Sequence, residues 1–199
     1  MNQSGLVVRL PIDQRPVIVA LAGPNGAGKT TFYNVFLQAA GLYFVEPDGL
    51  AKKLELDPYE AMRVADSLRE QLLVQRESFV FETVFSDPKG IKLGFLTKAM
   101  AAGYNVVLCF MGVSSPKVSG ERVAIRVSQG GHDVPPEKLI SRFPRTLANL
   151  KAAIPQLPHV FIFDNDGFNE CFHLLAIFHN GRPEILSDQI PSWLRPLLP

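Results

Sequence analysis

The sequence has few cysteines, almost no net charge and no long apolar run, and each shortage excludes a class of protein. Its two cysteines, Cys109 and Cys171, have no metal-ligand spacing and form no disulfide framework, which fits a reducing cytoplasm. The 20 lysines and arginines against 19 acidic residues give a net charge of +1, so no uniform field attracts nucleic acid or an acidic membrane. The longest apolar runs, such as 106–113, are far shorter than the ~20 residues of a membrane span, and the N-terminus carries no export signal. We therefore expect a cytoplasmic protein that binds neither nucleic acid nor a membrane.

The composition fits one folded domain. The 199 residues are 47% hydrophobic and 20% charged, which is enough apolar material for a sizeable core. There is no internal repeat and no low-complexity linker that would divide the chain. We therefore expect a single α/β domain over residues 1–199.

Apolar runs alternate with helical patterns along the chain. Continuous apolar runs between helices are typical of a buried parallel sheet, and the expected strands are 17–22, 43–45, 79–81, 106–112 and 160–163. The expected helices run from 29 to 40, from Asp57 to near 77, from just after 88 to 103, from 119 to 128 and from 136 to 153. Pro144 predicts a kink in the last helix, or two shorter helices that meet there. Asn180-Gly181 between two apolar runs predicts a C-terminal β-hairpin, and the tail around Trp193 and Leu194 is expected to pack onto the domain.

Residues 23–31, GPNGAGKTT, carry the most specific motif of the chain. They match G-x-x-x-x-G-K-[ST] directly after an expected strand, which indicates a phosphate-binding loop; an ordinary glycine-rich β–α turn is the alternative. Backbone N–H groups would surround a polyphosphate, Lys29 would reach its β- and γ-phosphates, and the Thr30 hydroxyl would bind Mg²⁺. We therefore expect ATP and Mg²⁺ as cofactors. The predicted nucleotide-binding residues are Gly23, Pro24, Asn25, Gly26, Ala27, Gly28, Lys29, Thr30 and Thr31. The expected fold is a three-layer P-loop NTPase with a five-stranded, mostly parallel sheet, a helical lid and the C-terminal hairpin.

Two carboxylates follow expected strands and are candidates for the chemistry. Glu82 follows 79–81, where a Walker-B-like carboxylate would bind Mg²⁺ or orient substrate; a capping or salt-bridged glutamate is the alternative. The strand 106–112 has no acidic residue at its end, which favours Glu82 for this role. Asp48 follows 43–45, and because parallel strand ends open onto one crevice, it is best placed to accept a proton from an acceptor hydroxyl. Asp48-Gly49 is also a common turn pair.

Arginines cluster in residues 119–150, where we expect the helical lid. Arg126 lies on the first of two expected helices, and Arg142 and Arg145 share a face of the second, with a glycine-containing loop between the helices. Such a lid would close over the nucleotide and bring cations to the transferred phosphate; a solvated basic face is the alternative. His132 in the loop is a candidate substrate contact, and a packing role is its alternative.

Four segments in this order resemble the zeta toxin family of P-loop kinases, most closely its small single-domain bacterial members. They are GPNGAGKTT at 23–31, EPDGLA at 46–51, FETVFS at 81–86 and RVAIRVSQGGHDVPPEKLISRFPRTLANL at 122–150. The resemblance implies a five-stranded parallel core and ATP-dependent phosphorylation of a hydroxyl on UDP-N-acetylglucosamine. It also implies an antitoxin as partner.

The resemblance assigns roles position by position. It makes Asp48 the acidic base, Glu82 and Thr83 the substrate-side residues, and Arg126 with Arg142 or Arg145 the phosphate-binding arginines. Small family members commonly have Asn-Ala-Asp where this chain has Glu46-Pro47-Asp48, so the segment that presents Asp48 differs here.

Three functions follow from these residues. The leading one is an ATP- and magnesium-dependent kinase for a small hydroxylated acceptor, such as a UDP-activated amino sugar. The alternatives are a metabolic kinase for a nucleotide or cofactor precursor, and a switch that binds ATP without turnover. An acceptor-side carboxylate and a lid with several arginines favour a kinase, because a switch needs neither.

Overall fold

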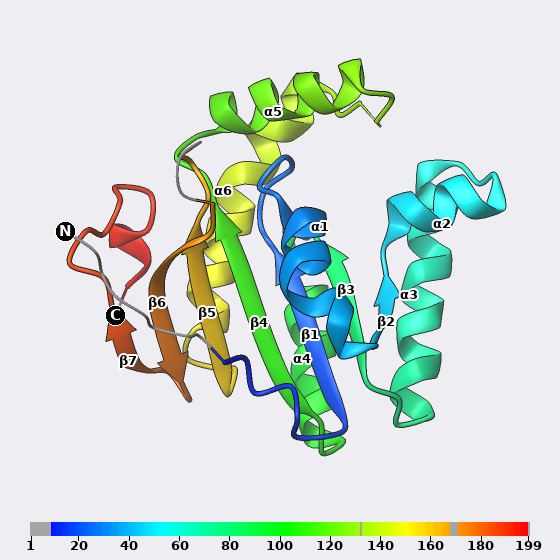
Figure 1. Ribbon diagram of the computed structural model, residues 1–199, viewed down its shortest axis with the longest axis vertical. Helices are drawn as coiled ribbons and strands as arrows, with labels where there is room; N and C mark the ends of the chain where they lie inside the picture. Colours follow the sequence, from blue (N-terminus) through cyan, green and yellow to red (C-terminus); the bar gives the residue numbers. More distant parts are fainter. Residues whose placement is uncertain (1–8, 132, 168–170, 199) are drawn as a thin grey trace.

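One sheet of seven strands organises the molecule. The computed structural model describes residues 9–131, 133–167 and 171–198. The strand order is β2-β3-β1-β4-β5-β6-β7 (Figure 1). The strands are β1 (Val17–Ala22), β2 (Tyr43–Val45), β3 (Phe79–Thr83), β4 (Asn105–Gly112), β5 (His159–Asp164), β6 (His173–His179) and β7 (Arg182–Leu186). The first five strands pair in parallel, and β6 and β7 are antiparallel.

The prediction of a five-stranded sheet was wrong. β6 and β7 pair across Asn180-Gly181, but β6 also pairs with β5 and so continues the sheet. Without β6, the outer edge of β5 would present unpaired N–H and C=O groups beside a buried apolar strand. Ala176 and Phe178 of β6 are fully buried, so the same pairing also extends the core.

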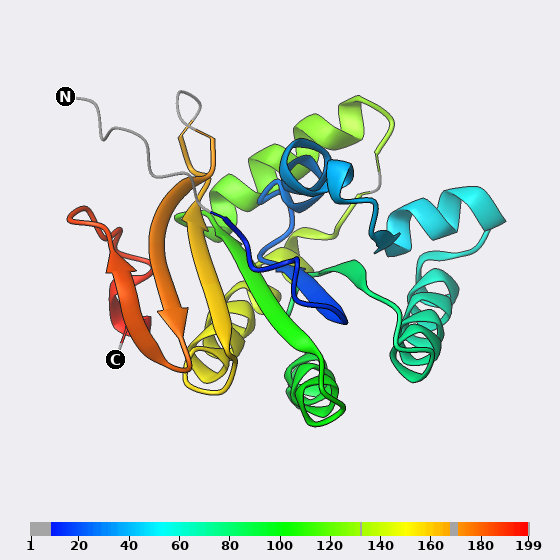
Figure 2. The same cartoon turned by 60° about the horizontal axis from the view of Figure 1, so that its bottom comes forward.

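The central strands are buried on both faces because helices cover both sides of the sheet. Ile18, Ala20 and Ala22 of β1 belong to one core cluster, and Val17, Val19 and Leu21 belong to another. This alternation is the period of two expected of a strand whose successive side chains point to opposite faces. Figure 2 shows the sheet between the segment that begins with α1 on one side and α4 and α6 on the other.

The helices confirm most of the expected order and differ at particular boundaries. They are α1 (Lys29–Phe32), α2 (Pro47–Leu54), α3 (Pro58–Val74), α4 (Ile91–Ala101), α5 (Pro116–Ser128) and α6 (Pro136–Ala153), with the short helices η1 (Tyr33–Leu37), η2 (Gln38–Ala40) and η3 (Arg195–Leu197). The expected helix 29–40 is therefore a succession of α, π and 3₁₀ turns. α5 begins before Ser119 because the Ser115 side chain accepts a hydrogen bond from Val118 N–H and caps it.

α6 continues through Pro144 as one helix, so the alternative of two helices was wrong. The fully buried Thr146 anchors it, since the Thr146 hydroxyl donates to the Val84 carbonyl 2.9 Å away, in the segment after β3. Asn149 adds two bonds from its amide, to the carbonyls of Phe85 and Asp87. These contacts hold α6 beside the end of β3.

The C-terminal segment packs onto the domain, as expected. Leu194 is fully buried and Trp193 is 6% exposed. The Trp193 indole N–H donates to Asp164 Oδ1 at 3.0 Å, and its ring lies so close to Gly112 that a Cβ there would come within 2.1 Å of it. The tail therefore closes the core over the ends of β4 and β5.

The two cysteines lie in opposite environments. Cys109 is buried in β4, and burial raises the pKa of its thiol, whereas Cys171 is exposed. Within the described ranges, no helix has the length and apolar character that crossing a bilayer requires.

We expect Trp193→Ala to lower the free energy of unfolding by about 3–5 kcal/mol, because it leaves a cavity in the core and removes the bond to Asp164. Urea denaturation followed by circular dichroism measures this change. The control is Val74→Ala, which alters a side chain that is 80% exposed and should change stability by less than about 0.5 kcal/mol. A loss below about 1 kcal/mol in Trp193→Ala would show that the tail is dispensable for the core.

Candidate active site

The loop after β1 has the backbone geometry that the motif predicts. Gly23, Gly26 and Gly28 have positive φ angles of 143°, 72° and 88°. A Cβ on Gly23 would come within 2.1 Å of the Met111 carbonyl oxygen, and one on Gly28 within 2.6 Å of the Asn165 amide nitrogen. The loop can therefore lie against β4 and the segment after β5 only if glycine occupies these positions.

Contacts from two other elements hold this loop. The Asn165 amide donates to the Ala27 carbonyl at 2.9 Å, and its oxygen accepts from Phe172 N–H at 3.2 Å. On the α5 side, the Ser119 hydroxyl donates to the Asn25 carbonyl at 2.6 Å. Sequence reasoning gave neither Ser119 nor Asn165 a role in the site.

Lys29 is folded into the loop. Its side chain is 5% exposed, and its ammonium donates to the carbonyls of Gly23 at 3.1 Å and Pro24 at 2.9 Å. The Glu82 carboxylate lies 3.6 Å from the same ammonium. Burial lowers the pKa of Lys29, and the charge of Glu82 opposes this shift. The buried cation has a carboxylate close by and lies at the opening of the loop.

The Thr30 hydroxyl lies between two carboxylates. Its oxygen is 2.7 Å from Glu82 Oε2 and 3.1 Å from Glu46 Oε1. Burial and the neighbouring charge of Glu82 raise the pKa of Glu46. Glu82 was a predicted site residue, whereas Glu46 was not. Glu46 comes directly after β2, and β2 lies next to the strand that carries Glu82. This position was the signal that could have identified Glu46.

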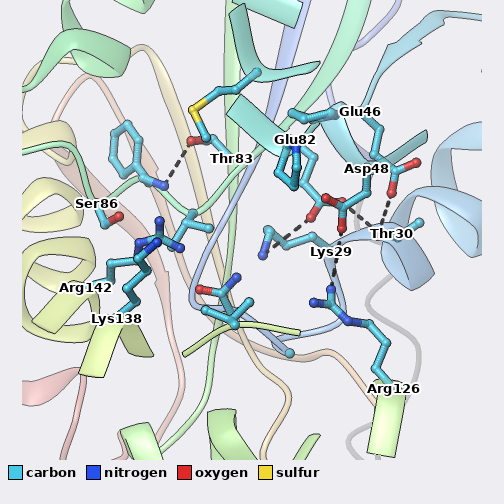
Figure 3. A pocket seen from close by; sticks show the side chains of 18 of the residues that line it. Lys29, Thr30, Glu46, Asp48, Glu82, Thr83, Ser86, Arg126, Lys138 and Arg142 are labelled. Carbon is cyan, nitrogen blue, oxygen red and sulfur yellow. Dashed lines mark hydrogen bonds and ion pairs between the residues drawn. The ribbon is translucent and has the colours of Figure 1, made fainter. Parts of the chain in front are cut away.

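Asp48 lies on a helix rather than in a turn. It occupies the first turn of α2, a helix that the sequence pattern did not predict. Its carboxylate is 59% exposed and lies 3.8 Å from the guanidinium of Arg126 on α5. Figure 3 shows Asp48 and Arg126 facing each other beside Lys29 and Thr30, so residues from α2, α5 and the loop converge.

A second group of polar side chains lies across the cavity (Figure 3). The Thr83 hydroxyl accepts a hydrogen bond from Phe85 N–H at 3.0 Å, which stabilises the turn after β3. Arg145 donates from Nε to the Ser86 carbonyl at 3.0 Å. Lys138 donates to the Tyr59 hydroxyl at 3.0 Å, and this bond lowers the pKa of Tyr59. Arg142 lines the same cavity, whereas the predicted contact His132 lies outside the described residues.

The cavity is also lined by three charged side chains that the sequence did not reveal, of which Arg69 is buried and Asp66 and Lys92 are partly exposed. The Asp66 carboxylate pairs with both Arg69 and Lys92, and the Arg69 guanidinium lies 4.9 Å from the centre of the Phe81 ring. Burial, together with the charge of Arg69, lowers the pKa of Lys92 to about 8. These residues come from α3, β3 and α4, and only the tertiary fold brings them together.

One cavity of about 780 Å³ is lined by Lys29, Thr30, Glu46, Asp48, Glu82, Arg126, Lys138, Arg142 and Arg145, together with Asp66, Arg69 and Lys92. Such a volume is within the range of small-molecule sites and accommodates a polyphosphate together with a second ligand. It is lined by the phosphate-binding loop, the start of α2, the end of β3, and α5 and α6. Figure 1 shows α5 above the carboxyl ends of the central strands, where ligands bind in parallel sheets.

The oxygen atoms of and around the Thr30 hydroxyl suit a magnesium ion as ligands. In the described part of the chain, no group of three or more histidine, cysteine, aspartate or glutamate side chains is arranged to hold a metal alone. One hydroxyl and two carboxylates lie together here. Mg²⁺ prefers oxygen ligands and uses one or two carboxylates, with water and substrate phosphates completing its shell. The residues present therefore fit this ion.

Solved structures share this fold. A chain in the crystal structure of AvrRxo1-ORF1:AvrRxo1-ORF2 with sulphate ions matches 92% of this chain, with a TM-score of 0.61 and 18% identity. The present chain spans 63% of the length of that one. A chain of the PezAT chromosomal toxin-antitoxin system of Streptococcus pneumoniae matches 80% of this chain and 72% of its own length, with a TM-score of 0.56 and 17% identity. Identities this low establish a common fold alone.

A family model adds evidence from the sequence itself. No curated protein matches the chain. The model of the zeta toxin family, described as "Zeta toxin", matches residues 51–174, which is more than half of the chain. The matched range begins after the phosphate-binding loop and Asp48, and it includes Glu82, α5 and α6. The chain therefore belongs to the zeta toxin family of P-loop kinases.

Proposed function

We propose that this protein uses ATP and Mg²⁺ to phosphorylate a hydroxyl of a small acceptor. The observation that carries the proposal is the shared cavity of Asp48 and the phosphate-binding loop. A carboxylate with substantial exposure opposite a polyphosphate site can accept the proton of an attacking hydroxyl. The structure of AvrRxo1-ORF1:-ORF2 with ATP, which has a TM-score of 0.58 and 18% identity to this chain, supports ATP as the nucleotide.

In this proposal, backbone N–H groups of residues 23–31 bind the phosphates, and Lys29 contacts the β- and γ-phosphates. Thr30 and Glu82 would hold Mg²⁺, which would neutralise part of the phosphate charge. The acceptor oxygen forms a bond to the γ-phosphorus while the bond from phosphorus to the β-phosphate bridging oxygen breaks. Asp48 takes the hydroxyl proton, and ADP carries away the bond electrons.

One arginine of α5 and one of α6, Arg126 and Arg142, stabilise the transferred charge. Arg126 already lies beside Asp48, and Arg142 lines the same cavity. Arg145 is bonded to the Ser86 carbonyl, so we assign it to positioning α6 against the end of β3. Closure of the α5–α6 segment would bring Arg126 and Arg142 to the γ-phosphate and exclude water from the γ-phosphate.

For the acceptor we propose a UDP-activated amino sugar such as UDP-N-acetylglucosamine. Family membership supports this class, and so does the cation-rich side of the cavity that Lys138 and Arg142 line, because these cations would attract an acceptor that carries phosphates.

The similarity to a chain of the PezAT toxin-antitoxin system supports an antitoxin as a protein partner. We also propose that residues 1–199 form one kinase domain in the cytoplasm.

Asp48→Asn should retain ATP binding and lose phosphate transfer by about 10²–10⁴-fold, because asparagine cannot take the hydroxyl proton. Transfer of labelled γ-phosphate to a panel of nucleotide sugars and nucleosides measures the loss, and calorimetry measures ATP binding. Asp188→Asn, which neutralises an exposed carboxylate elsewhere, is the control. Unchanged turnover in Asp48→Asn would remove it from this role. Absence of transfer to every acceptor, with Lys29→Ala behaving like the natural protein, would refute the kinase proposal.

The arginines should separate into two classes. We expect Arg126→Ala and Arg142→Ala each to lower kcat by at least about 10²-fold, since they lose charge stabilisation at the phosphate. Arg145→Ala should lower kcat by less than about tenfold, because one hydrogen bond to a neutral carbonyl contributes roughly 1 kcal/mol. Steady-state kinetics with ADP detection measures these changes. Equal losses in all three variants would contradict the assignment of Arg145.

Expression without an antitoxin should arrest bacterial growth if the acceptor is a nucleotide sugar that cell-wall synthesis consumes. Lys29→Ala should abolish the arrest, because it removes the contact to the phosphates. Growth curves after induction measure the effect, with immunoblots to confirm equal amounts of both proteins. Normal growth with active enzyme would favour the metabolic kinase over the toxin.

A further inference from the structure

Glu46 occupies a helix-capping position but does not cap its helix. It is the N-cap residue of α2, yet its side chain accepts no hydrogen bond from that helix. Its carboxylate instead turns to the phosphate-binding loop and lies 3.1 Å from the Thr30 hydroxyl. The side chain is therefore directed to the site rather than to the local needs of α2.

The Thr30 hydroxyl cannot satisfy both carboxylates beside it. A hydroxyl has one hydrogen to donate, and Glu82 Oε2 at 2.7 Å is the nearer acceptor. Glu82 also has a cation close by, the ammonium of Lys29 at 3.6 Å. Within the described residues, the ion pairs of this site join Lys29 to Glu82 and Arg126 to Asp48 rather than to Glu46. The charge of Arg126 acts on the half-buried Glu46 carboxylate only as a minor influence, behind burial and the charge of Glu82.

The neighbouring glycine makes room for this arrangement. Gly49 is the third residue of α2, and glycine is generally a weaker helix former than alanine. A Cβ at this position would come within 2.9 Å of Glu46 Oε2. Glycine is therefore present at position 49 although it does not favour a helix, and a side chain there would displace the Glu46 carboxylate.

We propose that Glu46 is a third protein ligand of the divalent cation, with Thr30 and Glu82, and that this chain binds the cation before the nucleotide. The inference rests on the proposed magnesium-dependent kinase. It adds Glu46 as a ligand of the cation and adds the order in which cation and nucleotide bind. Two carboxylates and a hydroxyl from three separate segments offer three oxygen ligands, and water would complete the shell of a hard cation in the absence of phosphate. The cation would supply Glu46 with a directly bound positive charge.

Mn²⁺ is the probe for this proposal, because its electron paramagnetic resonance signal falls when it leaves free solution for a protein site. The nucleotide-free protein should bind one Mn²⁺, and Mg²⁺ should compete for it. Glu46→Gln should weaken Mn²⁺ binding at least about tenfold, since losing even an indirect partner of a metal costs that much. Gly49→Ala should also weaken it, although it removes no charge. Glu55→Gln removes a carboxylate from the exposed end of the same helix and should bind Mn²⁺ normally.

The outcomes separate this inference from the kinase proposal. Wild-type Mn²⁺ affinity in Glu46→Gln, or failure of the nucleotide-free natural protein to bind Mn²⁺, overturns the inference even if phosphate is transferred. Mn²⁺ binding that depends on Glu46, in a protein that transfers no phosphate to any acceptor, supports the cation site and refutes the kinase. Thermal unfolding of each variant by circular dichroism verifies that it is folded before its affinity is compared.

Discussion

The parallel pairing of β3, β1 and β4 is the constraint on which the site depends. In this register Glu82 lies beside Leu21 and Thr83 beside Ala22, so the end of β3 reaches the point where the phosphate-binding loop leaves β1. β4 pairs with the other edge of β1 and brings the Met111 carbonyl against Gly23. Since every strand in this group ends on the same side, polar residues that follow different strands meet without any long-range electrostatic attraction.

Hydrogen bonds from two other segments hold the phosphate-binding loop, whereas the charged side chains around it are held more weakly. Asn165 and Ser119 fix the loop backbone through bonds to its carbonyls. Asp48 and Arg126 meet at 3.8 Å with partly exposed side chains, so their contact is weak and easily exchanged for a ligand. A firmly held loop beside exchangeable side chains would suit the nucleotide and the acceptor of the proposed kinase.

Local signals predicted the parts that depend on neighbouring residues in the chain. The loop, the start of α3 at Asp57 and the Asn180-Gly181 turn follow from short sequence patterns that depend on local interactions. Among the predicted site residues, those that line one cavity in the structure include Lys29, Thr30, Asp48, Glu82, Arg126, Arg142 and Arg145. Their chemical roles remain predictions.

The errors concern partners that lie far away in the chain. The hairpin was visible in the sequence, but its pairing with β5 depends on an edge that only the assembled sheet presents. Asp48-Gly49 suggested a turn, whereas Pro47 at the start of α2 and the packing of α2 on α3 made this segment helical. Spacing alone could not reveal that Arg145 is bonded to Ser86, or that Glu46 turns toward Thr30.

The contrast between the two cysteines gives this protein a natural attachment point. The thiolate is the reactive form of cysteine, and burial disfavours it at Cys109, so a maleimide dye would react with the exposed Cys171. The adjacent Phe172 N–H is bonded to Asn165, whose amide in turn holds Ala27 of the loop. A fluorophore on the unaltered chain would therefore be attached next to a residue that is linked to the loop through Asn165.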